Sequence, residues 1–309
     1  MQIVRDLKML PHSLRGASVA IGNFDGVHRG HRHVIDLARR PDAPLGVVTF
    51  EPHPRQYFSP EAPAFRLMNA TARAHRLRKL GIDVLVELPF TAALVRLSAQ
   101  EFVKHVLVGG LNVQNVVVGA DFRFGKGRTG TADDLRHFGA NMGFDVTIAT
   151  LLAHDDNNAV SSTAIRHALR TGAPRTAAAM LGHWHRIEGP VLHGEKRGRL
   201  LWYPTANMAL DHLHVPKFGV YAVTVDVLDG PYRGPYPGVA NIGIRPMFER
   251  TTPNLETHLF DFDGDLYGQT LSVGLVEFLR GEEKFDGPAA LIAQMDRDSI
   301  AARNALTAP

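Results

Sequence analysis

The first half of the chain alternates between two hydrophobic periods. Short apolar runs typical of buried strands alternate with longer stretches whose apolar residues recur at helical spacing. The strand-like runs are Ser18–Gly22, Leu45–Phe50, Val84–Leu88, Val113–Gly119 and Val146–Leu151, and the helical stretches are His31–Arg40, Ala70–Leu80, Ala99–Gly109 and Thr131–Asn141. This alternation predicts an α/β domain, a Rossmann-like parallel sheet covered by helices on both faces. Ligands of such sheets bind at the carboxyl ends of the strands.

The second half follows a period of two. In the strand-like run Gly219–Val227, alternate residues face the same side, namely Tyr221, Val223, Val225 and Val227. Leu255–Phe260 and Gln269–Phe278 also have strand character, and Asp-Gly and Gly-Pro turns separate the runs. We therefore expect a C-terminal antiparallel β-barrel closed by a terminal helix over Pro288–Leu306. The change of pattern near Leu181–Ile187 predicts two domains, 1-182 and 183-309, and 309 residues suffice for two cores.

Composition excludes several classes of protein. The chain has no cysteine, which excludes disulfides, thiolate metal sites and thiol nucleophiles. It has 34 Lys and Arg residues and 31 acidic residues. The basic residues occur in short runs interrupted by apolar residues, which indicates solvated helix faces rather than a nucleic-acid-binding surface. No apolar run approaches the roughly 20 residues that span a bilayer, and the N-terminus lacks the apolar core of a signal peptide. We expect a cytoplasmic protein with no membrane or nucleic-acid partner; its oligomeric state stays open.

The most informative motif lies between a predicted strand and a predicted helix. It reads Gly22-Asn23-Phe24-Asp25-Gly26-Val27-His28-Arg29-Gly30-His31. Glycines there permit a tight turn, and the free N–H groups of a helix start form an anion site. His28 and His31 share one helix face, where two imidazoles suit the stabilisation of charge on a nucleotide α-phosphate during in-line attack. The histidines could instead hold a metal with Asp25, or be surface residues, but the glycine frame favours the phosphate site.

This stretch resembles the His-x-Gly-His nucleotidyltransferase superfamily. Its extended form resembles the bacterial bifunctional riboflavin kinase/FMN adenylyltransferases, also called FAD synthetases. Further matching motifs follow in the family's order, namely Thr49–Pro54, Gly119–Gly125 and Ser161–Arg166. The resemblance implies that the first domain transfers AMP from ATP to FMN, giving FAD and pyrophosphate. It implies catalytic roles for His28, His31 and Arg166, and ATP binding by Gly22, Asn23, Phe24, Asp25 and Gly30.

The later motifs of this domain have their own physical chemistry. Three hydroxyl residues precede a helix and could hold the β- and γ-phosphates, or act as simple N-caps: Ser161, Ser162 and Thr163. The planar guanidinium of Arg166 can neutralise departing pyrophosphate. Phe122 and Phe124 could flank a flavin ring while Asp121 accepts a flavin hydrogen bond, and core packing is the alternative for the two aromatic residues.

Four motifs of the second half resemble the flavokinase domain of the same family. They are Gly194–Arg199, Pro204–Asn207, Gly238–Gly243 and Leu255–Phe260. The resemblance implies that this domain phosphorylates riboflavin to FMN, with ATP as co-substrate and Mg²⁺ as cofactor. It implies ATP binding by Gly194 and Arg199 and flavin binding by Asn241.

Three residues of these motifs would carry the kinase chemistry. Thr205 and Asn207 would supply the hard oxygen ligands that Mg²⁺ prefers. Glu256 matches the family's general base, which would take the proton of the ribityl 5′-hydroxyl as it attacks the γ-phosphate. Taken alone, Thr205 and Asn207 could be turn residues after Pro204, and Glu256 an exposed strand acid.

The chain departs from the family pattern at three places in its second half. Trp202-Tyr203 stands where Gly-Phe is usual, Met247 stands where Thr is usual, and His183 stands where Arg is usual. Trp202 could stack on a ligand ring or crowd the nucleotide. These departures bear on the efficiency of the kinase reaction more than on the adenylyltransferase site, where the match to the family is nearly complete.

Two other functions compete with this interpretation. The first domain could transfer a nucleotidyl group to another phosphate-bearing acceptor, with the second domain as a binding module. The chain could also be a flavin- or nucleotide-sensing regulator with degenerate sites. The presence of His28, His31 and Glu256 favours an enzyme, because a sensor needs no general base for a γ-phosphate transfer.

Overall fold

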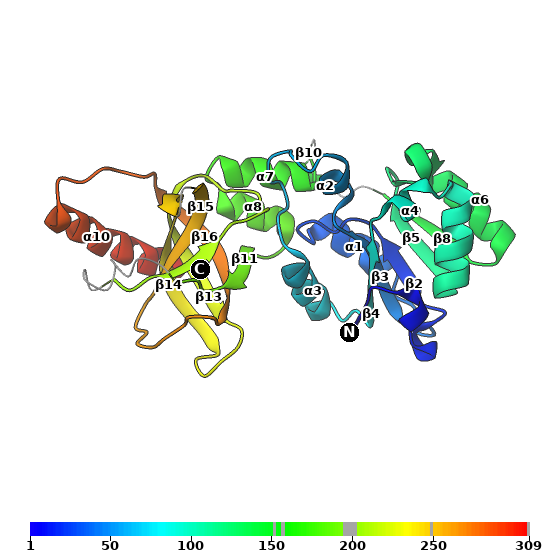
Figure 1. Ribbon diagram of the computed structural model, residues 1–309, viewed down its shortest axis with the longest axis horizontal. Helices are drawn as coiled ribbons and strands as arrows, with labels where there is room; N and C mark the ends of the chain where they lie inside the picture. The colour runs from blue at the N-terminus through cyan, green and yellow to red at the C-terminus, as the bar shows by residue number, and fades with distance from the viewer. Residues whose placement is uncertain (151–152, 156–157, 194–202, 248–249, 308–309) are drawn as a thin grey trace. The chain divides into compact units, whose positions relative to one another are not determined.

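The computed structural model describes residues 1–150, 153–155, 158–193, 203–247 and 250–307. Its chain forms two compact units (Figure 1). The first unit comprises Met1–Ala62 and Arg73–Val160, and the second comprises Pro63–Ala72 and Ser161–Pro309. In the described part of the chain, no helix has the length and apolar character needed to span a membrane.

The first unit contains the predicted parallel sheet. Its six strands lie in the order β1-β4-β3-β2-β5-β8, and every pairing is parallel. The strands are β1 (Gln2–Val4), β2 (Ser18–Ile21), β3 (Leu45–Glu51), β4 (Val84–Pro89), β5 (Asn115–Gly119) and β8 (Asp145–Ala149). Five of these six strands were predicted; the three-residue β1 is too short to give a periodic signal.

Helices cover both faces of this sheet, as predicted. They are α1 (Arg29–Leu37), α2 (Pro54–Phe58), α3 (Ala70–Lys79), α4 (Ala92–Arg96), α5 (Ala99–Phe102), the π-helical η3 (Val103–Leu111) and α6 (Ala132–Met142). Single helical turns are η1 (Leu7–Met9), η2 (His12–Leu14) and η4 (Lys126–Arg128), and the pairs β6 (Arg123–Phe124) with β7 (Gly130–Thr131) and β9 (Ala153–Asp155) with β10 (Asn158–Ala159) form two small sheets. Val19 and Ile21 face the main core, while Ala20 between them is equally buried on the other face, so these three residues of β2 are buried on both faces of the sheet.

The second unit contains the predicted barrel. Its antiparallel strands lie in the order β11-β16-β13-β14-β15-β12. They are β11 (His185–Pro190), β12 (Ala206–Ala209), β13 (Gly219–Val227), β14 (Gly234–Met247), β15 (Arg250–Leu259) and β16 (Thr270–Arg280). In the described residues, an antiparallel bridge between Leu192, just after β11, and Asn207 of β12 links the two outer strands and nearly closes the barrel. The terminal helix α10 (Pro288–Thr307) packs against β13, β14 and β16.

Two helices that follow the parallel sheet in the sequence belong by packing to the barrel. Helices α7 (Ser162–Arg170) and α8 (Pro174–Leu181) pack against each other, and α8 also contacts β11 and β16. The compact units therefore divide at residues 160 and 161, and the segment Pro63–Ala72 joins the second unit. The predicted boundary between residues 182 and 183 concerns function, with one activity assigned to each side, and it stays a prediction.

Candidate active sites

The motifs of the first unit meet at the carboxyl edge of its sheet. Strands β3, β2 and β5 are neighbours, and one of three motifs begins at or just after the carboxyl end of each strand. The N–H of Gly22 donates to the carbonyl of Val48 at 3.1 Å, and the hydroxyl of Thr49 donates to the carbonyl of Asn23 at 3.2 Å. Segments far apart in the sequence thus form one loop cluster where ligands of parallel sheets bind.

The two histidines of the first motif stack at the start of α1. His28 is the N-cap, and its Nδ1 accepts a hydrogen bond from the backbone N–H of His31 at 3.2 Å. The ring centroids of His28 and His31 lie 3.6 Å apart with 16° between the planes. Because Nδ1 of His28 accepts, the neutral ring carries its proton on Nε2. The arrangement presents an imidazole donor beside a helix N-terminus.

Gly30 leaves the room that the His28 ring occupies. A Cβ atom on Gly30 would lie 3.2 Å from both Cε1 and Nδ1 of His28. Few real Cβ contacts are this tight, and a buried ring held at a helix cap has little freedom to move. The glycine between the two histidines is therefore required by the histidine pair itself.

His31 has an electrostatic environment that favours its neutral form. Burial lowers its pKa well below the ordinary value of 6.5, and the nearby His28 lowers the pKa further. Its Nδ1 is buried without a hydrogen-bond partner. A buried polar atom without a partner is rare in a folded protein and is common where a ligand completes the site.

The turn between β2 and α1 uses unusual backbone angles. Phe24 has a φ of 51°, Val27 a φ of 44° and Gly26 a φ of 88°. Left-handed angles at two non-glycine residues store strain, which the surrounding packing must offset. Phe24 is 1% exposed, and its ring lies 5.1 Å from that of His31. The buried ring therefore fixes the turn against the histidine pair.

The predicted flavin residues after β5 differ in burial. Phe124 is buried in the main core and lies 5.7 Å from Phe102, whereas Phe122 is half-buried and stacks on Phe124 at 5.5 Å. Asp121 is exposed. Of the three predicted flavin residues, Phe124 thus has a packing role, and Phe122 and Asp121 are the accessible ones.

A second aromatic cluster near the same edge was missed by sequence reasoning. Phe90, directly after β4, makes edge-to-face contacts with Phe50, Tyr57 and Phe58 at 5.4 to 5.8 Å. Phe58 is 62% exposed. The available signal was the pair Tyr57-Phe58, which closes the helix that follows the Thr49–Pro54 motif.

The three hydroxyl residues at the start of α7 include one observed N-cap. The Oγ of Ser161 accepts from the N–H of Ala164 at 3.2 Å, while Ser162 begins the helix and Thr163 is exposed. Arg166 donates to the carbonyl of Phe65 at 3.3 Å and lies over the Phe65 ring at 5.7 Å. All these residues belong to the second compact unit, whereas His28 and His31 belong to the first.

Strand register brings the kinase candidates into one row of the barrel. Asn207 of β12 is directly opposite Glu256 of β15, and Glu256 is directly opposite Asn241 of β14. Ala206 and Ala240 face the barrel core, so their neighbours Asn207 and Asn241 lie on the outer face. Three residues far apart in the sequence therefore form one polar row.

Asn254 joins this row and was not identified from the sequence. It lies two residues before Glu256 on the same face, and its Nδ2 donates to Oε1 of Glu256 at 3.1 Å and to Oδ1 of Asn207 at 3.5 Å. Glu256 is 6% exposed, so it is not an exposed strand acid. The Oδ1 of Asn254 is buried without a hydrogen-bond partner. An amide oxygen thus stands beside the proposed base and metal ligand.

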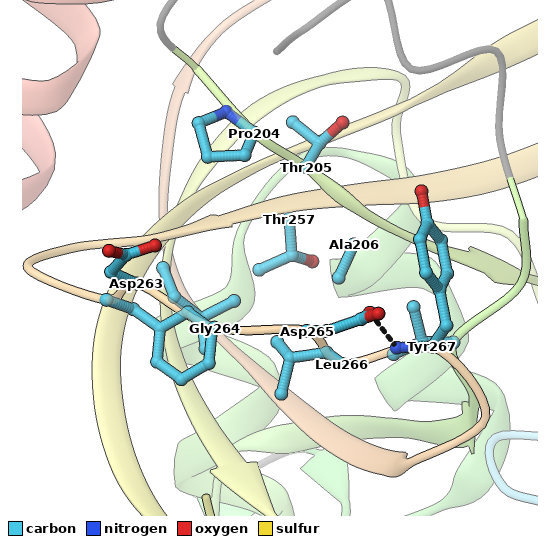
Figure 2. Close-up of a pocket in the computed structure, with 12 residues that line it drawn as sticks. Pro204, Thr205, Ala206, Thr257, Asp263, Gly264, Asp265, Leu266 and Tyr267 are labelled. Atoms are coloured by element: carbon cyan, nitrogen blue, oxygen red, sulfur yellow. Dashed lines mark hydrogen bonds between the residues drawn. The ribbon is translucent and has the colours of Figure 1, made fainter.

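A cavity of about 490 Å³ lies on the core side of β12. Pro204 and Thr205 lie across it from the loop Asp263–Tyr267, with Thr257 and Ala206 between them (Figure 2). Asp265 shapes this loop by accepting from the N–H of Tyr267 at 3.0 Å. The volume of the cavity suits a nucleotide base or a similar small group.

Two of the residues that depart from the family pattern, Tyr203 and His183, make contacts in the structure. The Tyr203 hydroxyl donates to Asp296 of α10, and the Tyr203 ring lies 5.0 Å from that of His258. His183 Nδ1 hydrogen-bonds the carbonyl of Trp184 at 2.8 Å. Gly194, Arg199 and Trp202 lie outside the described residues, as does the side chain of Met247.

No three His, Cys, Asp or Glu side chains gather as a metal site among the described residues. The candidate ligands Thr205 and Asn207 are of other types. With Asn254 and Glu256 they supply oxygen donors, which suit a hard divalent cation. The histidine pair, by contrast, gathers no carboxylate cluster around it in the described residues.

Two family models match the chain in succession. The FAD synthetase model matches residues 10–164, and the riboflavin kinase model matches residues 181–306. Together with a histidine pair at a parallel sheet edge and an acid–amide row on a barrel, they define a two-part enzyme of flavin nucleotide synthesis.

Curated relatives match over the full chain. A bifunctional riboflavin kinase/FMN adenylyltransferase of Pseudomonas fluorescens is 45% identical over 100% of this chain and 99% of its own length. The Escherichia coli (strain K12) protein of the same name is 38% identical over 98% and 97%. A solved structure described as a macrolide-efflux protein from Streptococcus pneumoniae is 31% identical, with a TM-score of 0.82 over 98% of each chain. The chain belongs to the family of bifunctional riboflavin kinase/FMN adenylyltransferases.

Proposed function

We propose that this chain makes FMN at the barrel and FAD at the histidine motif, in two successive reactions that both use ATP. The observation that carries the proposal is the stacked pair of His28 and His31 at the start of α1, in a chain whose barrel holds Glu256 in register with Asn207. Neither reaction needs a covalent enzyme intermediate, so positioning and electrostatics carry the catalysis. We assign the activities to residues 1-182 and 183-309.

In the adenylyl transfer, a phosphate oxygen of FMN attacks the α-phosphorus of ATP and pyrophosphate leaves. The Nε2–H of His28 donates to the α-phosphate oxygens, and the neutral His31 holds the ring of His28 in its stack. Ser161, Ser162 and Thr163 bind the β- and γ-phosphates together with the N–H groups of α7. Arg166 offsets the charge of the departing pyrophosphate.

In the kinase reaction, the ribityl 5′-hydroxyl of riboflavin attacks the γ-phosphorus of ATP, FMN forms and ADP leaves. Glu256 takes the hydroxyl proton, and the hydrogen bond from Asn254 fixes the plane of its carboxylate. Asn241, opposite Glu256, binds the flavin side of the row. Gly194 and Arg199 bind ATP, and the cavity beside Thr205 receives part of the nucleotide.

The divalent cation of the kinase reaction is Mg²⁺ in this proposal. Thr205 and Asn207 hold it, and the unpartnered Oδ1 of Asn254 is a third oxygen donor nearby. When bound, Mg²⁺ neutralises phosphate charge during transfer. The oxygen-only donor set fits this hard cation.

At the adenylyl site, the flavin ring lies against exposed aromatic side chains. Phe122 and the accessible Phe58 offer faces for a planar ring, while Asp121 accepts a hydrogen bond. Phe124 supports Phe122 from the core rather than touching the flavin. We place these reactions in the cytoplasm, with no nucleic-acid partner.

One assay tests the whole proposal. Purified protein is incubated with riboflavin, ATP and Mg²⁺, and FMN and FAD are separated by chromatography. Formation of both products is the expected result. FAD from supplied FMN but no FMN from riboflavin would limit the chain to adenylyl transfer, and neither product would indicate a sensor. Omitting Mg²⁺ and adding a chelator should stop FMN formation.

A further inference from the structure

The helix that carries Arg166 is held by a loop of the barrel. The loop between β12 and β13, residues 210–218, contacts α7 at two places. The Nε2 of His214 hydrogen-bonds the carbonyl of Arg166 at 3.0 Å, and the N–H of Lys217 donates to the carbonyl of Leu169 at 3.0 Å. The adenylyl motif around Arg166 is thus fastened to the strand connection that follows Asn207.

His214 also closes a ring of hydrogen bonds around Arg166. Its backbone N–H donates to the carbonyl of Arg66 at 2.7 Å. The neighbouring carbonyl of Phe65 accepts from Nη1 of Arg166 at 3.3 Å. One residue of the barrel therefore fixes both the helix backbone at Arg166 and the segment that receives the Arg166 side chain.

The chemical state of His214 suits this role. It is 8% exposed, and burial together with the charges of Arg166 and Arg170 lowers its pKa, against the opposing effect of its hydrogen bond to Arg166. A neutral imidazole has one N–H. Because a carbonyl can only accept, the proton is on Nε2, which donates to the carbonyl of Arg166.

We propose that His214 is a positioning residue for adenylyl transfer, which sets the guanidinium of Arg166 through its hydrogen bonds to the Arg166 and Arg66 backbones. The inference rests on the proposed role of Arg166 in binding the departing pyrophosphate. It means that a residue within the kinase part of the chain completes the geometry of the adenylyl-transfer site. His214 does not belong to the row of Asn207, Asn241 and Glu256, so the kinase reaction does not depend on it.

The test uses the full chain and measures both activities. His214→Leu removes the donor and is expected to lower kcat for FAD formation from supplied FMN about fivefold, the effect of one lost hydrogen bond, with FMN formation within about twofold of wild type. His214→Gln keeps an N–H near the position of Nε2 and should restore most of the rate. His167→Leu is the matched control, because His167 is an exposed histidine on α7. It should change neither activity.

A double-mutant cycle separates positioning from general damage. If His214 acts through Arg166, then His214→Leu costs less than about twofold in an Arg166→Ala background. The same fivefold loss in both backgrounds, equal loss of both activities, or no loss in His214→Leu would overturn the inference. An Arg166→Ala variant with normal FAD formation would instead remove the proposed role of Arg166, and the inference with it.

Discussion

The two sites are built in opposite ways. At the histidine motif, the key contacts join residues two or three positions apart, since Gly30, His28 and His31 all lie within one turn of α1. In the barrel row, the key contacts join Asn207, Asn241 and Glu256, which only the pairing of three strands brings together. One site is local in sequence, and the other depends on register.

This difference predicts how each site fails. A local motif fails when its own backbone or ring is displaced, and the rest of the unit is little affected. A row across strands loses its activity when one functional group is replaced. A shift of one strand by one residue would turn every side chain of that strand to the other face. Paired measurements of FMN and FAD formation test this separation.

Glu256→Gln should have the largest effect. The substitution keeps the size and the hydrogen bond from Asn254 and removes the basic oxygen, so FMN formation should fall by about 10²–10⁴. Adenylylation of supplied FMN should not change. A variant with normal kinase turnover would remove Glu256 from the mechanism.

His28→Ala tests the local site. Loss of a preorganised donor to developing phosphate charge typically costs about 10²–10³, and we expect FAD formation to fall at least tenfold, with FMN formation nearly unchanged. His31→Ala should act in the same direction because it removes the stacking partner. Equal loss of both activities would mean that the histidines maintain the fold instead.

Acid should destabilise the barrel through His185. Burial, with smaller effects of His214 and His183, lowers the pKa of His185 from 6.5 to about 3. The unfolded chain then binds the proton more tightly, so the stabilisation is complete above about pH 6.5 and is lost as the pH falls toward the folded-state pKa. Between pH 6.5 and pH 5 this loss is about 2 kcal/mol.

Denaturant unfolding of His185→Leu at both pH values checks this expectation. The variant should lose less stability than wild type on acidification, by about 2 kcal/mol. The exposed His167→Leu is the control and should follow wild type. Identical pH dependence in His185→Leu and wild type would show that His185 does not titrate as its burial demands.

Gly30→Ala should lower FAD formation about tenfold, since the new Cβ meets the His28 ring at 3.2 Å and a small displacement of a catalytic group is costly. FMN formation should stay within about twofold. Gly189→Ala is the matched control, because its Cβ would meet only Met208 Cε, at an ordinary 3.7 Å. A fully active Gly30→Ala variant would show that the histidine stack is not needed.

Tyr203→Phe should have the smallest effect. It removes the hydrogen bond to Asp296 of α10 and should reduce kcat/KM for FMN formation about threefold, without changing FAD formation. Tyr236→Phe, which loses a hydroxyl bonded to the carbonyl of Tyr232, is the control and should leave both activities unchanged. No change in Tyr203→Phe would leave this departure from the family without a kinase role.

Sequence reasoning found the elements with strong periodicity. Apolar runs predicted the strands from β2 to β8 of the parallel sheet, and alternation predicted β13 over its observed bounds. The full length of β14 escaped because Pro235, Pro237 and Gly238 interrupt its pattern. Asn254 escaped because an asparagine before a strand-like run gives no signal until strand pairing places it beside Glu256.

The sequence alone suffices to identify the residues at strand ends and helix starts, because backbone periods and glycine turns act over a few residues. It thereby determined the histidine motif, the fold class of each half and, through the motif order, the family. The strand order that joins Asn207, Glu256 and Asn241 is visible in the folded chain and not in any local pattern. The folded chain also places α7 with the barrel and Phe124 in the hydrophobic core of the first unit. These outcomes depend on contacts between distant segments, whose energies no local pattern encodes.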